Sequence, residues 1–179
     1  NWQFYFVPVN NPFMIQAKIA RTECAGDPNF PVGAVLVKDG EVVARAGNGF
    51  NRGPSIHVCP RIVLDCPSGV GYDLCNLHDP EGHAEPQLIK TALEAQIETK
   101  DAHVYLYGHC WCCEPCWDSM INAGISKVFL PENADQLFSR DRVYSEIFKS
   151  SVKKVTVIAS NSLREIIESV CAEMGIQIV

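Results

Sequence analysis

His83-Ala84-Glu85 and, further along the chain, Cys113-Glu114-Pro115-Cys116 are the two stretches that decide the fold of this sequence. Together they supply one imidazole and two thiols, which are ligand types that zinc prefers, and one carboxylate that need not be a ligand. Three protein ligands leave a tetrahedral zinc ion one open position, and an open position distinguishes a catalytic site from a structural one. At a helix start, Glu85 and His83 can reach the same pocket. The pattern indicates a metal-activated water with a neighbouring proton shuttle.

The sequence after these cysteines shows which of them belong to the motif. Two C-x-x-C patterns overlap, Cys110 to Cys113 and Cys113 to Cys116, and only the second is followed directly by a helix-like run that stops at Gly124. H-x-E followed by P-C-x-x-C is the signature of zinc deaminases, in which the Glu is an acid/base and not a ligand. The chain therefore resembles the cytidine/deoxycytidylate deaminase superfamily, and within it the deoxycytidylate deaminase branch. The resemblance implies zinc ligands at His83, Cys113 and Cys116, and a catalytic Glu85.

The resemblance extends upstream and covers roughly residues 12 to 130. The run from Pro31 to Gly40 resembles the first hairpin of the family. A gapless count from Val32 places Asn48 where the family keeps an asparagine that bonds the sugar, so Asn48 and Ala84 are the implied substrate-binding residues. Asn51 is a rival, because Gly49-Phe50-Asn51 resembles another version of this loop, and Asn48 could instead simply support a turn.

Three departures from the family pattern bear on the identity of the substrate more than on the metal chemistry. Cys112 stands where the family usually has Pro, and Trp111 stands where many members have Glu or Ser. After the His motif, Pro86-Gln87-Leu88 replaces the usual polar-Asn-Ala run. None of these changes removes a ligand or the carboxylate.

Composition predicts one ordinary globular domain. The chain has 179 residues with 47% hydrophobic content, which is enough to build a core. We expect a single domain over residues 1–179, with a Cys-rich insert at 51–82 and a C-terminal helix–strand extension at 131–179. No stretch approaches the roughly 18 apolar residues that cross a bilayer, and the apolar start Asn1–Val7 is short and lacks a basic leader. These features predict no membrane association and a cytoplasmic protein.

The net charge of −6 argues against a polynucleotide partner. Proteins that bind nucleic acid polymers carry a basic surface that neutralises phosphates, and here Lys and Arg are scattered. A mononucleotide needs only one or two cations. The charge therefore favours a small-molecule nucleotide substrate.

Nine cysteines are many for this length. Their odd number and the cluster Cys110, Cys112, Cys113 and Cys116 suit metal binding in a reducing cytosol better than a disulfide framework. The alternative for Cys113 and Cys116 is a closed structural zinc site that uses Cys110, Cys112 or His109 as an extra ligand.

Helix-like and strand-like segments alternate along the chain, which predicts a layered α/β domain. The resemblance specifies a three-layer α/β/α cytidine-deaminase-like fold, with a mixed five-stranded sheet and the zinc between two helix N-termini. The predicted helices are 12–21, 85–95, 115–123, 134–149 and 162–174, and the predicted strands are 32–37, 42–46, 102–107, 125–130, 152–159 and 176–179. Asp39-Gly40 predicts a type I′ turn within the first hairpin.

The insert contains a second set of potential ligands. Some deoxycytidylate deaminases that this chain resembles carry a second zinc close to the active site, with cysteines roughly where Cys24 and Cys59 lie. The alternative is that these are buried free thiols. The potential ligands are Cys24, His57, Cys59, Cys66, Cys75 and His78.

The resemblance implies a hydrolase acting on the C–N bond of a cyclic amidine, with dCMP converted to dUMP and ammonia as the leading reaction. Three alternatives stay open: another aminopyrimidine, nucleoside or base as substrate, an inactive zinc-stabilised scaffold, and an editing deaminase that acts on RNA or DNA. Family likeness also implies a homo-oligomer, a dimer or a hexamer.

Overall fold

The computed structural model describes residues 3–28, 30–54, 59–64, 66 and 71–139. All of them belong to one compact unit that ends at Ser139. The strands predicted at 152–159 and 176–179 and the helix predicted at 162–174 lie outside the described residues. The single domain over the whole chain therefore stays a prediction, and so does the extension beyond residue 139.

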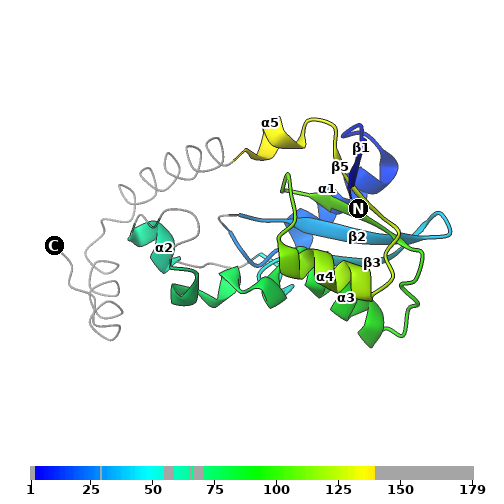
Figure 1. Ribbon diagram of the computed structural model, residues 1–179. Helices are drawn as coiled ribbons and strands as arrows, with labels where there is room; N and C mark the ends of the chain where they lie inside the picture. Colours follow the sequence, from blue (N-terminus) through cyan, green and yellow to red (C-terminus); the bar gives the residue numbers. More distant parts are fainter. Residues whose placement is uncertain (1–2, 29, 55–58, 65, 67–70, 140–179) are drawn as a thin grey trace. The chain divides into compact units, whose positions relative to one another are not determined.

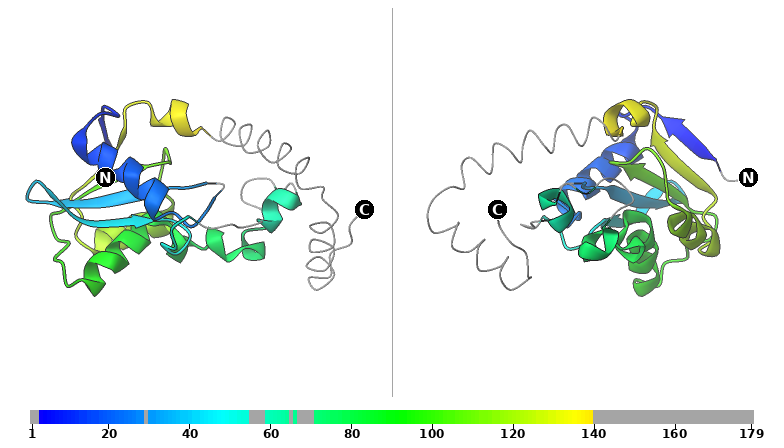
Figure 2. Two further views of the ribbon diagram at one scale, coloured as in Figure 1. Left: turned by 180° about the vertical axis from the view of Figure 1, so that it is seen from behind. Right: turned by 60° about the vertical axis from the view of Figure 1, so that its left-hand side comes forward.

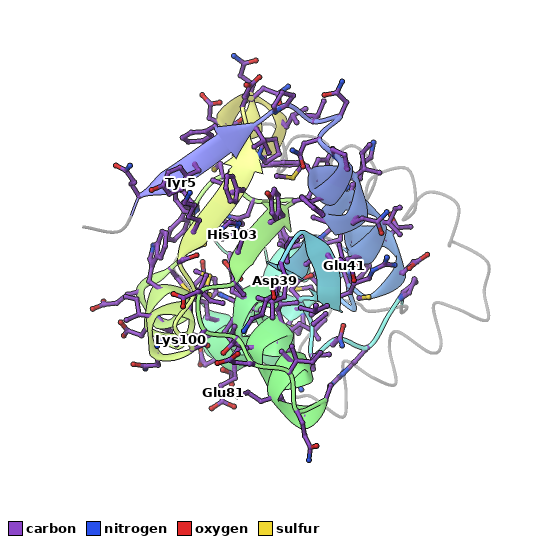
Figure 3. All side chains as sticks on the ribbon, turned by 90° about the vertical axis from the view of Figure 1, so that its right-hand side faces the viewer. Tyr5, Asp39, Glu41, Glu81, Lys100 and His103 are labelled. Carbon is purple, nitrogen blue, oxygen red and sulfur yellow. The ribbon has the colours of Figure 1, made fainter. Side chains whose placement is uncertain are left out.

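The predicted hairpin and its turn are confirmed. Strands β2 (Gly33–Lys38) and β3 (Glu41–Gly47) pair antiparallel. Asp39 and Gly40 have φ angles of 51° and 82°, and two successive positive φ angles are what a type I′ turn requires. Figure 3 labels Asp39 and Glu41 at this end of the hairpin.

The sheet is mixed and five-stranded, as the resemblance implied. Strands β4 (His103–Tyr107) and β5 (Lys127–Pro131) are parallel to each other, whereas β2 is antiparallel to β4. The order across the sheet is β1-β5-β4-β2-β3. Since β4 runs directly into the segment that carries Cys113, this segment lies at the C-terminal end of a central strand of the sheet.

Strand β1 (Phe4–Val7) was not predicted from the sequence, and it provides the fifth strand of the described sheet by pairing parallel with β5. Phe4-Tyr5-Phe6-Val7 is a continuous apolar run without alternation, and periodicity alone cannot assign such a short run to a strand. Tertiary contacts order this run: Phe4 packs against Trp117 with ring centroids 4.9 Å apart, and Tyr5 lies 5.5 Å from Phe129. The strand therefore depends on partners that are distant in sequence.

Helices cover both faces of the sheet and make the three layers (Figures 1 and 2). Helix α1 (Pro12–Glu23) packs Met14, Ala17 and Ala20 on one face, with Val35 and Tyr105 of the sheet. Helices α3 (Ala84–Glu94) and α4 (Glu114–Asn122) pack on the other face, around a larger core. Both active-site motifs therefore lie on the same side of the sheet.

The described parts of the insert form short helical turns. They contain α2 (Pro60–Val63) and the 3₁₀ turns η1 (Tyr72–Leu74), η2 (Asn76–His78) and η3 (Pro80–Gly82). The helix predicted at 134–149 is observed as α5 (Ala134–Phe138); it ends before Ser139, whose ψ of 143° is not helical, and the remainder of the prediction lies outside the described residues. Within the described ranges, no helix is both long enough and apolar enough to cross a membrane.

Helix α1 passes close to the sheet at Gly33. A Cβ atom added there would lie 2.0 Å from the backbone N of Arg21 and 2.4 Å from the backbone O of Ala17. Backbone atoms of a helix cannot move aside as a flexible side chain does, so only glycine fits at this position.

We expect Gly33→Ala to lower the free energy of unfolding by about 3 kcal/mol or more, because α1 must move away from β2. Gly40→Ala is the matched control: its φ of 82° is strained for Ala, but no atom lies within 4 Å of the added Cβ. The control should lose about 1–2 kcal/mol. Urea unfolding of both variants measures the difference, and equal losses would contradict the close contact.

Candidate active site

The first motif forms the beginning of α3. His83 is the N-cap residue, with φ −70° and ψ 157°, and Glu85 lies in the first helical turn. Pro86 lies in the same first turn, where Pro is tolerated because the first backbone N–H groups of a helix have no intrahelical acceptor. Glu85 is buried, with 5% of its surface exposed. The helix start therefore holds an imidazole and a buried carboxylate close together.

The second motif forms the beginning of α4 in the same way. Cys113 is the N-cap residue, with φ −74° and ψ 163°, and Pro115 lies in the first turn. Cys116 is 1% exposed and packs in the core shared with α3. The positive end of each helix dipole thus lies at the motif, where it stabilises negatively charged ligands.

The two helix starts bring three ligand atoms into a compact triangle. The Nδ1 atom of His83 lies 3.4 Å from Sγ of Cys113 and 3.3 Å from Sγ of Cys116, and the two sulfur atoms are 3.3 Å apart. Tetrahedral zinc with bonds of about 2.0–2.3 Å needs ligand atoms about 3.3–3.8 Å apart. The residues therefore fit a zinc ion with no rearrangement larger than a few tenths of an ångström.

The charges of the triangle suit a metal as well. The hydrogen bond between the two thiols holds the pKa of Cys113 well below its usual range and raises the pKa of Cys116. Burial alone would lower the pKa of His83, but its hydrogen bond to Cys113 and the charge of Glu85 raise the pKa overall. The two thiols thus share one proton, which a cation would displace on binding.

The extra ligands of the closed-site alternative lie outside this triangle. Among the described residues, the potential ligands within 4.8 Å of one another here are His83, Cys113 and Cys116 alone. The thiol of Cys110 is directed to the carbonyl oxygen of Phe138, at 3.9 Å. The geometry therefore favours three protein ligands over four.

Glu85 has a neighbour that sequence reasoning did not identify. Burial raises the pKa of the Cys112 thiol, and the charge of Glu85 and a hydrogen bond to it raise the pKa further. The thiol is thus a neutral donor to the Glu85 carboxylate. The sequence signal was Cys112 itself, which stands next to the predicted ligand Cys113 where the family usually has Pro. Its thiol can donate a hydrogen bond to the Glu85 carboxylate, and a Pro could not.

His109 lies near the same group. Its Nδ1 atom accepts a hydrogen bond from the backbone N–H of Trp111, at 3.2 Å. Burial lowers the pKa of His109, against an opposite effect of Glu85. The imidazole is therefore neutral near pH 7, with its proton on Nε2.

Of the predicted substrate-binding residues, Ala84 is the first residue of α3 and Asn48 directly follows β3. Ala84 is 1% exposed and belongs to the core. The side chain of Asn48 accepts from the backbone N of Val32, at 2.9 Å, and donates to the carbonyl oxygen of Phe30, at 2.7 Å. These bonds use two of the four hydrogen-bonding positions of the amide, so Asn48 supports its loop whether or not it also contacts a substrate.

The structure divides the second set of potential ligands. Cys59, Cys75 and His78 come together, with Sγ of Cys59 3.2 Å from Nε2 of His78. Cys24 and Cys66 are not part of this group. His57 lies outside the described residues. Three of the predicted ligands thus form one cluster, to which η2 contributes His78.

Three solved structures illustrate the resemblance. The diaminohydroxyphosphoribosylaminopyrimidine deaminase/5-amino-6-(5-phosphoribosylamino)uracil reductase from Thermotoga maritima is 24% identical over 66% of this chain, with a TM-score of 0.40. This chain covers only 28% of that protein. The dCMP deaminase of cyanophage S-TIM5 is 19% identical, over 73% of this chain and 88% of its own, with a TM-score of 0.43.

A tRNA:A34 deaminase, which performs A-to-I editing at the wobble position of tRNA, is 30% identical. The match covers 66% of this chain and 72% of that one, with a TM-score of 0.42. At TM-scores this low, none of the three structures carries an argument about the substrate. No curated protein sequence matches this chain.

The family is decided by the sequence profile. Residues 9–131 match the profile described as the cytidine and deoxycytidylate deaminase zinc-binding region. This range contains both motifs and the whole of the described ligand triangle. The match covers more than half of the chain, and the chain therefore belongs to the cytidine and deoxycytidylate deaminase family of zinc-binding proteins.

Proposed function

We propose that this protein is a hydrolytic deaminase of a small aminopyrimidine, and that its leading reaction converts dCMP and water to dUMP and ammonia. The observation that carries the proposal is the buried carboxylate of Glu85 beside the triangle of His83, Cys113 and Cys116. A structural metal site has no use for a buried acid that is not one of its ligands. Family membership supports the chemistry and leaves the substrate open.

The triangle would hold the zinc ion through Nδ1 of His83 and the two Sγ atoms. When bound there, zinc acts as a Lewis acid that can lower the pKa of a water molecule to about 7. Cys113 and Cys116 lie at the start of α4, where the helix dipole stabilises their thiolates. Burial of Cys116 in the core keeps the ligand atoms fixed between the two helices.

Glu85 moves the protons of the reaction. Its carboxylate accepts one proton from the attacking water and passes it to the ring nitrogen next to the reacting carbon. The oxygen is then bonded to that carbon as a hydroxyl; Glu85 carries the hydroxyl proton to the amino group, so the C=O bond forms, the C–N bond breaks and neutral ammonia leaves. The Cys112 thiol, which bonds to Glu85, holds the carboxylate in place during these transfers.

Asn48 and Ala84 are the proposed walls of the substrate site, with the Asn48 amide using its remaining hydrogen-bonding positions. The negative net charge of the chain favours a single nucleotide over a nucleic acid polymer as the substrate. Assembly into a homo-oligomer, a dimer or a hexamer, and a cytosolic location complete the proposal.

Replacing the proton shuttle tests the mechanism. We expect Glu85→Gln to retain zinc and to lower kcat by about 10²–10⁴-fold, because the amide keeps the shape but cannot carry protons. Glu81→Gln is the control, because Glu81 is exposed and lies at the outer edge of the molecule in Figure 3. Ammonia release and bound zinc are measured for both variants. An active Glu85→Gln enzyme would exclude Glu85 as the shuttle.

A substrate panel tests the choice of dCMP. We expect ammonia release to be fastest with dCMP among dCMP, CMP, cytidine, guanine and adenosine. Activity on another member with none on dCMP would reverse the order of the candidates. No turnover of any member, together with tight zinc binding, would favour the zinc-stabilised scaffold, and turnover only within single-stranded RNA or DNA would favour an editing enzyme.

We also propose that Cys59, Cys75 and His78 supply three of the four ligands of a second, structural zinc ion. Cys59 and Cys75 are buried, and the ring of His78 is fixed by stacking on Tyr72, at 5.8 Å. A metal there would join segments of the insert whose hydrophobic cluster, among the described residues, is small: the two cysteines and Leu77, with Phe50 packed against them.

Zinc content tests this second site. We expect about two zinc ions per chain, falling to about one in Cys75→Ser, because a serine hydroxyl is a poor replacement for a thiolate ligand. Cys66→Ser is the matched control and should keep both ions, because Cys66 lies outside the cluster. One ion per chain in the unmodified protein would eliminate the second site.

A further inference from the structure

The loop after β3 has an unusual backbone. Gly49, Phe50 and Asn51 have successive φ angles of 71°, 61° and 54°, and Gly53 follows with 73°. Glycine adopts such angles freely, and Asn does so more often than most residues. Phe does not. Of the five non-glycine residues with positive φ in the described part of the chain, Phe50 is the only apolar one.

Contacts of the Phe50 ring compensate for this strain. The ring packs with Cys59, Cys75 and Leu77 of the insert. It also covers Gly82 so closely that a Cβ atom added there would lie 3.1–3.3 Å from the ring atoms Cε2, Cδ2 and Cζ. A side chain at position 82 would thus displace the ring. Strained residues persist where the surrounding structure holds them, and they concentrate at functional sites.

The backbone of the same loop is fixed to the same glycine. The N–H of Gly49 donates to the carbonyl oxygen of Gly82, at 2.8 Å. On the other side, the carbonyl oxygen of Asn48 accepts from the N–H of Gly26, also at 2.8 Å. The loop therefore links the segment next to α1 with the turn that precedes α3.

Gly82 is the last residue of η3 and directly precedes His83, the N-cap of α3. Its position sets where the helix begins, and with it the places of His83 and Glu85. We infer that Phe50 is a positioning residue: its ring clamps Gly82, holds the start of α3 against the loop that carries Asn48, and so sets the distance between substrate loop and proton shuttle. The inference rests on the proposed function for its kinetic consequence only.

Phe50→Gly removes the contacts of the ring and also the strain of a positive φ. The gain from the relieved strain therefore offsets part of the stability lost with the contacts. We expect kcat to fall about tenfold or more, because a small displacement of catalytic groups is costly, while the zinc bound by His83, Cys113 and Cys116 is retained. Phe50→Leu keeps apolar bulk over Gly82 and should recover most of kcat. Asp101→Gly is the matched control, since it relieves a similar φ of 61° in the loop before β4.

Amide hydrogen exchange provides a readout that does not depend on activity. We expect Phe50→Gly to accelerate exchange across residues 80–87, and Asp101→Gly to leave this segment as in the unmodified protein. Exchange at 80–87 that is equal in the two variants would overturn the inference, and so would an unchanged kcat in an active Phe50→Gly enzyme. If the unmodified protein deaminates no substrate, the proposed function fails while the exchange experiment still tests the clamp.

Discussion

The convergence of two helix N-termini on one side of the sheet is the constraint on which the site depends. His83 and Cys113 are both N-cap residues, and their ligand atoms lie 3.4 Å apart. Thiolates and a carboxylate buried this deeply would be costly without positive charge nearby. The helix dipoles supply part of that charge, and a bound cation supplies the rest. Because α3 and α4 pack on a shared core, the ligand geometry is built into the packing of the domain.

Much of this arrangement could be predicted from the sequence. Both motifs are local, and each lies at the start of a helix with a Pro in its first turn, where backbone N–H groups have no intrahelical acceptor. The spacing within each motif therefore predicts that His83 and Glu85 lie close together, and likewise Cys113 and Cys116. The Asp39-Gly40 turn is similarly local, and its positive φ angles were expected. The resemblance supplied the mixed five-stranded sheet and the position of the metal between two helix starts, which periodicity alone cannot give, whereas the strand order was known only from the structure.

The parts that could not be predicted depend on contacts between distant segments. Strand β1 is four residues long and is ordered by Trp117 and Phe129. The potential second site offered more ligands than one ion needs, and only the folded insert separates Cys59 from Cys66. The sequence placed Phe50 in the Gly49-Phe50-Asn51 pattern but gave no sign of its role, because a left-handed φ and a contact with Gly82 cannot be read from a sequence. The loops around the site, which decide the substrate, are thus the least predictable part of the protein.

A crystal structure of the zinc-loaded protein, with the metal located by anomalous scattering, tests the central claim most directly. The account predicts zinc bound by His83, Cys113 and Cys116, with a solvent oxygen in the fourth position and the Glu85 carboxylate beside that oxygen without binding the metal. A fourth position filled by Cys110, Cys112, His109 or Glu85 would contradict it, because a closed ion has no place for the water that the reaction consumes.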